Sequence, residues 1–344
     1  MNTSVASGAR EQGRPDDMAQ MTMVEALNRA LNESMTADDR VCVMGQDIAV
    51  NGGVFRVTKG LLDRFGADRV FDTPLAEDGI VGTAVGMAIY GLRPVAEIQF
   101  SGFTMQAFDQ IEQNMARMRN RSRGKYPISM VMRTPYGGGI RAVEHHSESR
   151  EAYWAHTPGL KVVIPSGPRN ARALLNAAIL DPDPVVFYEP KAVYRAFRED
   201  VPDEMETLPI GTARIAREGA DLTLIAYGAV MRPTLEAAED LADLHQVDVE
   251  VIDLLSIKPM DTETIVNSVT KTGRCVIVHE GPRTCGIAAE IIARLNEHAF
   301  EYLLAPIRRV TGFDTHFPYF QVERHYLPDS ETIAEAVRET LAWE

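Results

Sequence analysis

The strongest constraint in this sequence is a regular alternation of short apolar runs with longer segments whose apolar residues recur at helical spacing. The alternation begins at Met21 and continues almost to the C-terminus. In the first half, the runs expected to form buried strands are RVCVMGQD, RVFDTPL, RPVAEIQF, PISMVMRT, LKVVIP and PVVFYEP. Strands that alternate with helices form parallel sheets covered by helices, so the pattern predicts a doubly wound α/β domain.

The alternation lapses around residues 195–210, where the charged, proline-bearing stretch RAFREDVPDEMETLPIG is typical of a linker. A second alternation follows, with helices expected at 231–245, 261–270, 286–298 and from Asp329 onward. The sequence therefore predicts two α/β domains, residues 21–200 and a smaller one at 201–344. Residues 1–20 lack the apolar core of a signal peptide and are expected to be a disordered tail.

Composition narrows the classes of partner. The net charge of −14 argues against nucleic acid or an anionic membrane and suits a basic protein partner. No run approaches the roughly 18 apolar residues of a membrane-spanning helix. Cys42, Cys275 and Cys285 form no metal-like or disulfide-like pair, which fits a reducing cytoplasm, so we expect a cytoplasmic protein.

Two adjacent acids, Glu77 and Asp78, begin the apolar helix expected at 78–91. Acids in a first helical turn often serve only to satisfy the helix terminus. One acid suffices for that purpose, and Gly82 and Gly86 form a smooth ridge that would let a second backbone approach closely. A carboxylate beside such an interface would be partly desolvated, so Glu77 is a candidate working acid.

The loop TPYGGGIRAVEHHSESREAYWAHTPG follows an expected strand and holds three histidines. His145 and His146 are adjacent and His156 lies further on, without the spacing of a zinc motif. Structural or solvated histidines are the simpler interpretation. However, loops at the carboxyl ends of parallel strands are where such sheets bind ligands.

Several motifs together resemble one family. TPLAEDGIVG, AEIQFSGFTMQAFDQI, HHSESREAYWAHTPGLKVVIPS, PVVFYEPKAVYRA, EVIDLLSIKPMD and RCVIVHEGPRTCG are similar to the beta subunits of thiamine diphosphate-dependent 2-oxo acid dehydrogenases. The resemblance runs in order from about Met21 to the C-terminus. It implies a pyrimidine-binding domain followed by a transketolase C-terminal domain, and an alpha-subunit partner in an α2β2 heterotetramer.

The resemblance also implies a divided cofactor site. Thiamine diphosphate enzymes hold the diphosphate through magnesium on a GDG…N motif, and this chain contains no GDG. We therefore expect it to bind only the pyrimidine half of the cofactor, while the alpha subunit supplies the other half.

The family match implies roles for four residues. Glu77 would hydrogen-bond the pyrimidine and favour the imino tautomer that takes the thiazolium proton. Leu75 would brace the cofactor and Phe103 would pack on the aminopyrimidine, although many branched-chain relatives have tyrosine there. His146 would help to pass the acyl group to the lipoyl group of the acyltransferase component.

Some relatives also hold potassium, and the resemblance carries that site over to Ile128, Val131, Ala178, Asp181 and Asp183. Asp181 and Asp183 could equally be ordinary turn residues before prolines.

Substrate and partners stay open in part. The motifs YEPKAVYRA and AEIQF resemble the branched-chain type and favour a branched-chain 2-oxo acid as substrate, with pyruvate as the second candidate. The alternative functions are the beta subunit of an acetoin dehydrogenase and a non-catalytic assembly subunit. The acyltransferase is expected to dock near the C-terminal domain, where Glu335 and Glu339 lie on the closing helix.

Overall fold

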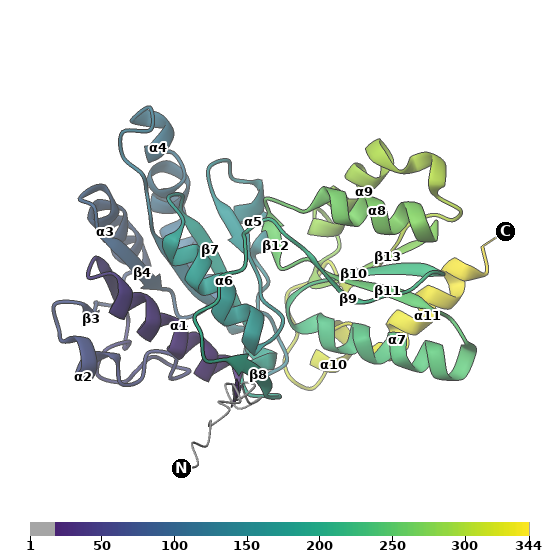
Figure 1. Ribbon diagram of the computed structural model, residues 1–344, viewed down its shortest axis with the longest axis horizontal. Coiled ribbons are helices and arrows are strands. Elements are labelled where there is room, and N and C mark those ends of the chain that lie inside the picture. The colour runs from purple at the N-terminus through teal and green to yellow at the C-terminus, as the bar shows by residue number, and fades with distance from the viewer. Residues whose placement is uncertain (1–17, 344) are drawn as a thin grey trace, which may run out of the picture.

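The computed structural model describes residues 18–343 as two α/β lobes (Figure 1). The strands of the first sheet are β2 (Val41–Gly45), β3 (Val70–Asp72), β4 (Arg93–Glu97), β5 (Val131–Tyr136), β6 (Lys161–Val163), β7 (Val185–Pro190) and β12 (Ser256–Lys258). The second sheet contains β9 (Arg214–Arg217), β10 (Leu222–Ala226), β11 (Val249–Asp253), β13 (Cys275–Pro282) and β14 (Arg308–Gly312). The predicted two-domain α/β class is confirmed.

The first sheet has the strand order β12-β6-β7-β5-β4-β2-β3, and its neighbours are parallel except for β12, which pairs antiparallel with β6. The second has the order β14-β13-β10-β11-β9, again parallel except at its β9 edge. Since β12 lies far along the chain, the second half of the sequence contributes an edge strand to the first sheet.

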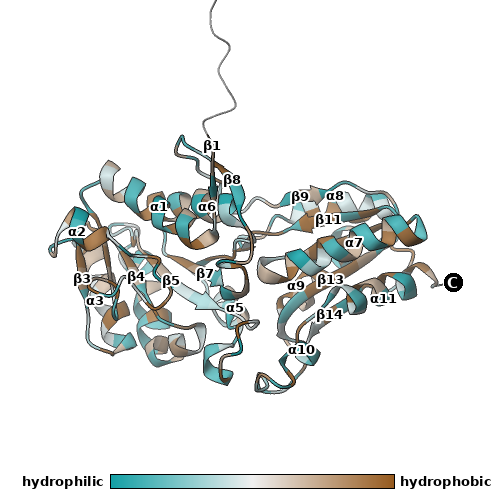
Figure 2. Cartoon of the chain, turned by 90° about the horizontal axis from the view of Figure 1, so that it is seen from below, coloured by the Kyte–Doolittle hydropathy of each residue, from teal (hydrophilic) through white to brown (hydrophobic). Residues whose placement is uncertain are grey.

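Helices cover both faces of each sheet (Figure 1). Those of the first lobe are α1 (Met23–Ala37), α2 (Leu61–Phe65), α3 (Glu77–Ile89), α4 (Met118–Arg121), α5 (Glu151–His156) and α6 (Pro168–Leu180). Those of the second lobe are α7 (Met231–His245), α8 (Thr262–Thr272), α9 (Ile287–His298), α10 (Glu323–Tyr326) and α11 (Ser330–Leu341). Many of these helices carry hydrophilic and hydrophobic residues side by side, as Figure 2 shows for α7 and α11, because only one face of each is buried.

One apolar core runs through both lobes. It begins under α3 and α5 on one face of the first sheet and continues through Ile225, Tyr227 and Ile252 to α8 and α9 of the second. A separate core lies between α1, α6 and the opposite face of the first sheet. The shared core makes the interface between the lobes hydrophobic, which favours a fixed relative position.

Residues 1–17 lie outside the described residues, so the disorder expected there is not tested. For Met18–Gln20 that prediction is wrong, because β1 (Met18–Met21) pairs antiparallel with β8 (Glu199–Pro202). The strand β8 belongs to the stretch expected to be a linker. The backbone groups of β1 and β8 satisfy one another's hydrogen bonds. Neither segment has the apolar alternation of a strand, so its sequence alone did not predict this pairing.

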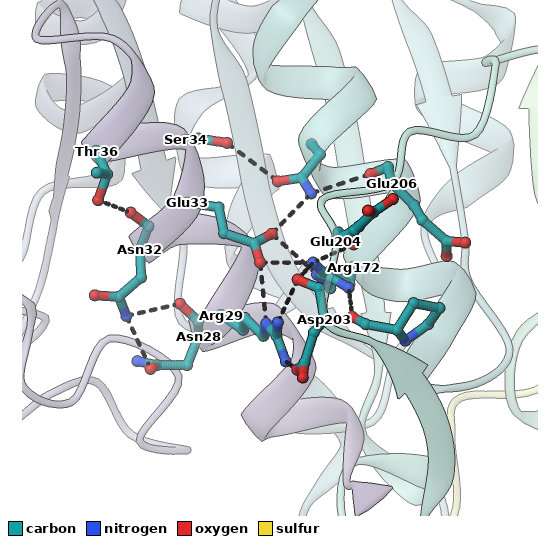
Figure 3. Close-up of polar contacts among 12 residues, drawn as sticks. Asn28, Arg29, Asn32, Glu33, Ser34, Thr36, Arg172, Asp203, Glu204 and Glu206 are labelled. Atoms are coloured by element: carbon teal, nitrogen blue, oxygen red, sulfur yellow. Dashed lines mark hydrogen bonds and ion pairs between the residues drawn. The ribbon is translucent and has the colours of Figure 1, made fainter. Parts of the chain in front are cut away.

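A buried arginine holds this region to the first lobe (Figure 3). Arg172 of α6 donates to both carboxylate oxygens of Glu33 on α1, at 2.6 and 2.9 Å, and to the carbonyl of Glu204 at 2.8 Å. It also donates to the carbonyl of Pro202 at the end of β8. One guanidinium thus joins two helices to the segment that leads into the second lobe.

The apolar spacing of TMQAFDQIEQNMARMRNRS, residues 104–122, predicts one long helix, but the structure breaks it. The chain forms the 3-10 helix η1 (Ser101–Ala107), the π-helix η2 (Gln110–Met115) and the short α4. Ala107, Ile111 and Met115 are all fully buried, and they recur every four residues. All three belong to the core under α3, so the broken segment still buries the side that a single helix would bury.

A fully buried ion triad joins the central strands of the first sheet. Arg133 of β5 donates to Glu189 of β7 at 2.6 and 3.0 Å and to Glu97 of β4 at 2.9 Å. Arg133 is 1% exposed, Glu97 4% and Glu189 0%. Burial raises the pKa of Glu97, and the Arg133 guanidinium opposes that rise.

We predict that Arg133→Met lowers the free energy of unfolding by about 3–5 kcal/mol, because it leaves two buried carboxylates without their cation. Urea unfolding measures the change. Arg40→Met is the matched control, since Arg40 pairs with Asp38 at the surface and its side chain is 58% exposed; that change should cost far less stability, because solvent screens an exposed pair. Equal effects of the two substitutions would contradict a special role for the triad.

Candidate active site

The predicted site residues follow three neighbouring strands of the first sheet. Glu77 follows β3, Phe103 lies on η1 after β4, and His146 ends the 3-10 helix η3 (Glu144–His146) after β5. Parallel strands bring their carboxyl ends to one edge of a sheet, which is where such folds bind ligands. The helix α3 packs against η1, and η1 packs against η3, so the three segments are contiguous.

His146 lies in an aromatic cluster. Its ring centroid is 4.3 Å from that of Phe100 and 5.3 Å from that of Phe103, in both cases edge to face. The imidazole Nδ1 is buried and has no hydrogen-bonding partner among the described residues. Burial lowers the pKa of His146, and the charges of Lys191 and His145 lower it further, so the imidazole is neutral at neutral pH. A neutral imidazole can accept a proton.

Glu77 and Leu75 lie at a more open part of this edge. Glu77 is the first residue of α3, whose N-cap residue, Ala76, provides no side-chain cap. The Glu77 side chain is half-buried and Leu75 is 70% exposed. The desolvation expected of Glu77 is therefore not provided by this chain alone, and a partner surface would have to supply it.

The two glycines of α3 have different surroundings. A Cβ on Gly82 would lie 3.2 Å from the amide oxygen of Gln110, so this glycine makes room for η2 of the same chain. Gly86 faces open space, and Tyr90, one turn further on, is 91% exposed. Only the outer face near Gly86 remains for the expected approach of a second backbone.

The other histidines of the loop do not join a metal site. His145 is exposed, with its Nδ1 3.7 Å from a carboxylate oxygen of Glu148. His156 ends α5. Within residues 18–343, no three His, Cys, Asp or Glu side chains form a group that could hold a metal ion.

The carboxylates of the expected potassium site are already engaged. Lys161 donates to both oxygens of Asp181, at 2.8 and 2.7 Å, and Arg119 pairs with Asp183. Of the remaining residues, Ile128, Val131 and Ala178 are buried and could offer only backbone carbonyls, two of which already accept the amides of Met130 and Asp181. Potassium binding stays a prediction that depends on those carbonyls.

A buried polar cluster behind the site was not anticipated. Glu151 of α5 accepts a hydrogen bond from the hydroxyl of Tyr227 at 2.9 Å, and the ring of Tyr227 stacks on His279 of β13. All three are at most 2% exposed. Together they line the junction of the lobes beside a cavity of about 990 Å³, which also contacts Ser147 and Glu148, the residues after His146. Since members come from both lobes, no local pattern marks the cluster.

The pKa of Glu151 predicts a pH-dependent stability. Burial raises it to about 7, whereas an unfolded glutamate titrates near 4.3. The folded state therefore holds a proton that the unfolded state releases between these values, so the free energy of unfolding falls as pH rises from about 4 to 7. Glutamine mimics the protonated acid at every pH. We therefore predict that Glu151→Gln abolishes this decrease in the free energy of unfolding, which is on the order of 3 kcal/mol in the wild type.

Urea unfolding of wild type and variant at pH 5 and pH 8 measures this effect. The variant should exceed the wild type in stability at pH 8, and the difference should be much smaller at pH 5, where most of the loss has not yet occurred. Glu335→Gln, on the exposed face of α11, is the control and should leave the pH dependence unchanged. Parallel curves for wild type and Glu151→Gln would overturn the prediction.

The acids expected to guide docking lie on the outer side of α11. Glu335 is exposed, whereas Glu339 is paired with Arg308 at 2.6 Å.

No helix in the described part of the chain is long and apolar enough to cross a membrane.

Comparison with known proteins agrees with this geometry. The sequence matches the transketolase pyrimidine-binding domain over residues 19–196 and the transketolase C-terminal domain over residues 211–333. Among solved structures, a split-gene transketolase described as an inactive beta4 tetramer superposes with a TM-score of 0.78 at 23% identity, over 94% of this chain and 99% of that one. The fold and the site thus define a two-domain protein of the transketolase type.

Sequence relatives are more specific. The chain is 50% identical to a pyruvate dehydrogenase E1 component subunit beta of Acholeplasma laidlawii, over 93% of this chain and 98% of that protein. It is 49% identical to a 3-methyl-2-oxobutanoate dehydrogenase subunit beta of Mycobacterium tuberculosis, over 93% and 92%. The chain belongs to the family of beta subunits of thiamine diphosphate-dependent 2-oxo acid dehydrogenases, as the motifs predicted.

Proposed function

We propose that this chain forms the pyrimidine-binding half of an active site that decarboxylates a 2-oxo acid and passes the acyl group to a lipoyl group. The observation that carries the proposal is the open edge of the first sheet, where Leu75 is exposed and the helix that begins at Glu77 packs against η1, which carries Phe103 of the Phe103–His146 pair. Because this edge is exposed in the single chain and the sequence has no GDG motif, we infer that an alpha subunit covers it and holds the magnesium-diphosphate half.

The residues present fit the pyrimidine half of thiamine diphosphate. Phe103 offers an apolar ring face, Leu75 an exposed aliphatic surface and Glu77 a carboxylate at a helix N-terminus. When bound, the cofactor supplies the electron sink for decarboxylation. Glu77 would hold a proton against the pyrimidine nitrogen, a hydrogen bond that strengthens once a partner excludes water.

His146 would act in the second half of the reaction. Its neutral imidazole lies beside Phe103, and its Nδ1 has no hydrogen-bonding partner among the described residues. The ring can therefore exchange a proton as the acyl group moves to one sulfur of the oxidised lipoyl disulfide, whose S–S bond breaks and whose other sulfur takes up a proton. The lipoyl acyltransferase component is the expected acceptor, with docking near the second lobe.

The substrate is a short 2-oxo acid. Pyruvate and branched-chain relatives match this chain at 50% and 49% identity, so overall similarity does not separate them. The branched-chain preference expected from the motifs stays a prediction. Phe103 lacks a hydroxyl, so specificity at this position would depend on apolar contact alone.

The experiment that tests the proposal is reconstitution with an alpha subunit. The assembled wild type should decarboxylate 2-oxo acids only with thiamine diphosphate and magnesium, and the isolated chain should show no turnover. Robust turnover by the isolated chain, or none by the assembly with either substrate class, would refute the proposal.

Glu77→Gln should assemble normally but reduce turnover by roughly 10²–10⁴-fold, the range typical of acid–base groups. Deuterium exchange at the thiazolium carbon of the bound cofactor reports the same defect directly. Asp78→Asn is the matched control, because Asp78 is the neighbouring first-turn acid and is exposed. Normal exchange in the Glu77 variant would return this residue to a purely structural role.

His146→Ala should impair lipoyl reduction more than decarboxylation, because the imidazole is proposed to act in acyl transfer. Decarboxylation is followed with an artificial electron acceptor, and lipoyl reduction with the isolated lipoyl domain. His145→Ala, at an exposed neighbouring position, is the control. Equal losses in both assays would place His146 earlier in the reaction.

A further inference from the structure

The three consecutive glycines after β5 lie against the second lobe. Gly137 has a φ of +81°, and a Cβ there would lie 1.8 Å from a carboxylate oxygen of Glu280. A Cβ on Gly138 would lie 2.3 Å from the ring of Phe317. The amide of Gly139 donates to the carboxylate of Glu323 at 2.6 Å. The loop that leads to His146 therefore has bare backbone because Glu280, Phe317 and Ala192 occupy the space that side chains at these three positions would need.

A lysine of the first lobe lies at the same junction. Lys191, in the 3-10 helix η4 (Lys191–Val193) after β7, is 3% exposed, while Glu280 is 4% and Glu323 5% exposed. Its Nζ has no hydrogen-bonding partner among the described residues. It lies 5.7 Å from the ring centroid of Phe100, the ring that packs against His146.

Charge links these groups. Burial lowers the pKa of Lys191 to about 7, and the carboxylates of Glu280 and Glu323 oppose that change. Burial raises the pKa of Glu280, while Lys191 and a 3.0 Å hydrogen bond from Ser149 lower it. Each group is therefore costly to bury alone and less costly beside the others.

We propose that Lys191, Glu280 and Glu323 form a positioning site for the loop 137–146, which ties the second lobe to the placement and protonation of His146. The inference rests on the proposed function, in which His146 serves acyl transfer. The carboxylates hold the loop backbone. Burial lowers the pKa of His146 most, and the charge of Lys191, which faces the same aromatic ring, adds to that effect and favours the neutral imidazole.

The first test measures the loop itself. In the α2β2 assembly without cofactor, Glu323→Met removes the acceptor of the Gly139 amide, so hydrogen exchange in 137–148 should accelerate about tenfold or more. Glu250→Met is the matched control, because Glu250 is also a buried carboxylate of the second lobe that accepts a glycine amide, that of Gly219, and pairs with a lysine. Unchanged exchange in the Glu323 variant, or equal acceleration by both, would overturn the proposal.

The second test measures the protonation of His146. Lys191→Met removes a positive charge, which makes the imidazolium less unfavourable and should move the pKa of His146 upward by about half a unit or more. The pH dependence of diethyl pyrocarbonate modification of His146, read by peptide mass spectrometry, gives the midpoint. The other charged groups that influence His146, His145 and Glu144, are unchanged in the variant. Lys191→Arg should retain the low midpoint.

Neither readout requires turnover, so the inference and the proposed function can fail separately. In the active assembly, Lys191→Met should shift the acid limb of lipoyl reduction to higher pH in step with the modification midpoint. An unmoved midpoint would overturn the role of Lys191 even if the wild type is fully active. An inactive wild type with a moved midpoint would instead refute the proposed function.

Discussion

The alignment of the central strands, and of the parts of the site that follow them, depends on the buried triad of Arg133, Glu97 and Glu189. Each of three adjacent strands contributes one member, so the charges can meet only in one strand register. Each of these strands then leads to one part of the site: Phe100 and Phe103 soon after β4, Lys191 directly after β7, and His146 at the end of the longer loop after β5. An ion triad of this kind contributes less to net stability than to specifying a single alignment.

Local periodicity predicted most of the framework. The helix expected at 231–245 has exactly those bounds in α7, and the PRNARALLNAAIL segment coincides with α6, because each carries an apolar stripe on one face. The family and the two-domain class were likewise within reach of the motifs. The pairing of Phe103 with His146 also follows the expectation that strand-end loops converge.

What the sequence did not reveal depends on tertiary contacts. β12 and the β1–β8 ribbon form by pairing with distant segments, and residues 101–121 form successive 3-10, π and α turns where their spacing indicated one helix. Glu280 carries no sequence signal of its role, since its partners Lys191 and Ser149 lie in the other lobe. One signal was present but unused: opposite charges at the ends of apolar runs, as in VAEIQF and MVMRTP, indicate buried pairing between neighbouring strands.

The antiparallel addition of β12 to β6 has a consequence for biosynthesis. Ser256 of β12 pairs with Val163 of β6. The ribosome must therefore translate about 90 residues after β6 before the strand that pairs with it exists. At a ribosomal rate of 5–20 residues per second, that interval lasts roughly 5–20 s. During it the nascent chain exposes an unpaired β6 edge, the kind of surface that chaperones shield and that pairs wrongly with other chains. The first sheet can therefore be completed only after much of the second lobe has been synthesised.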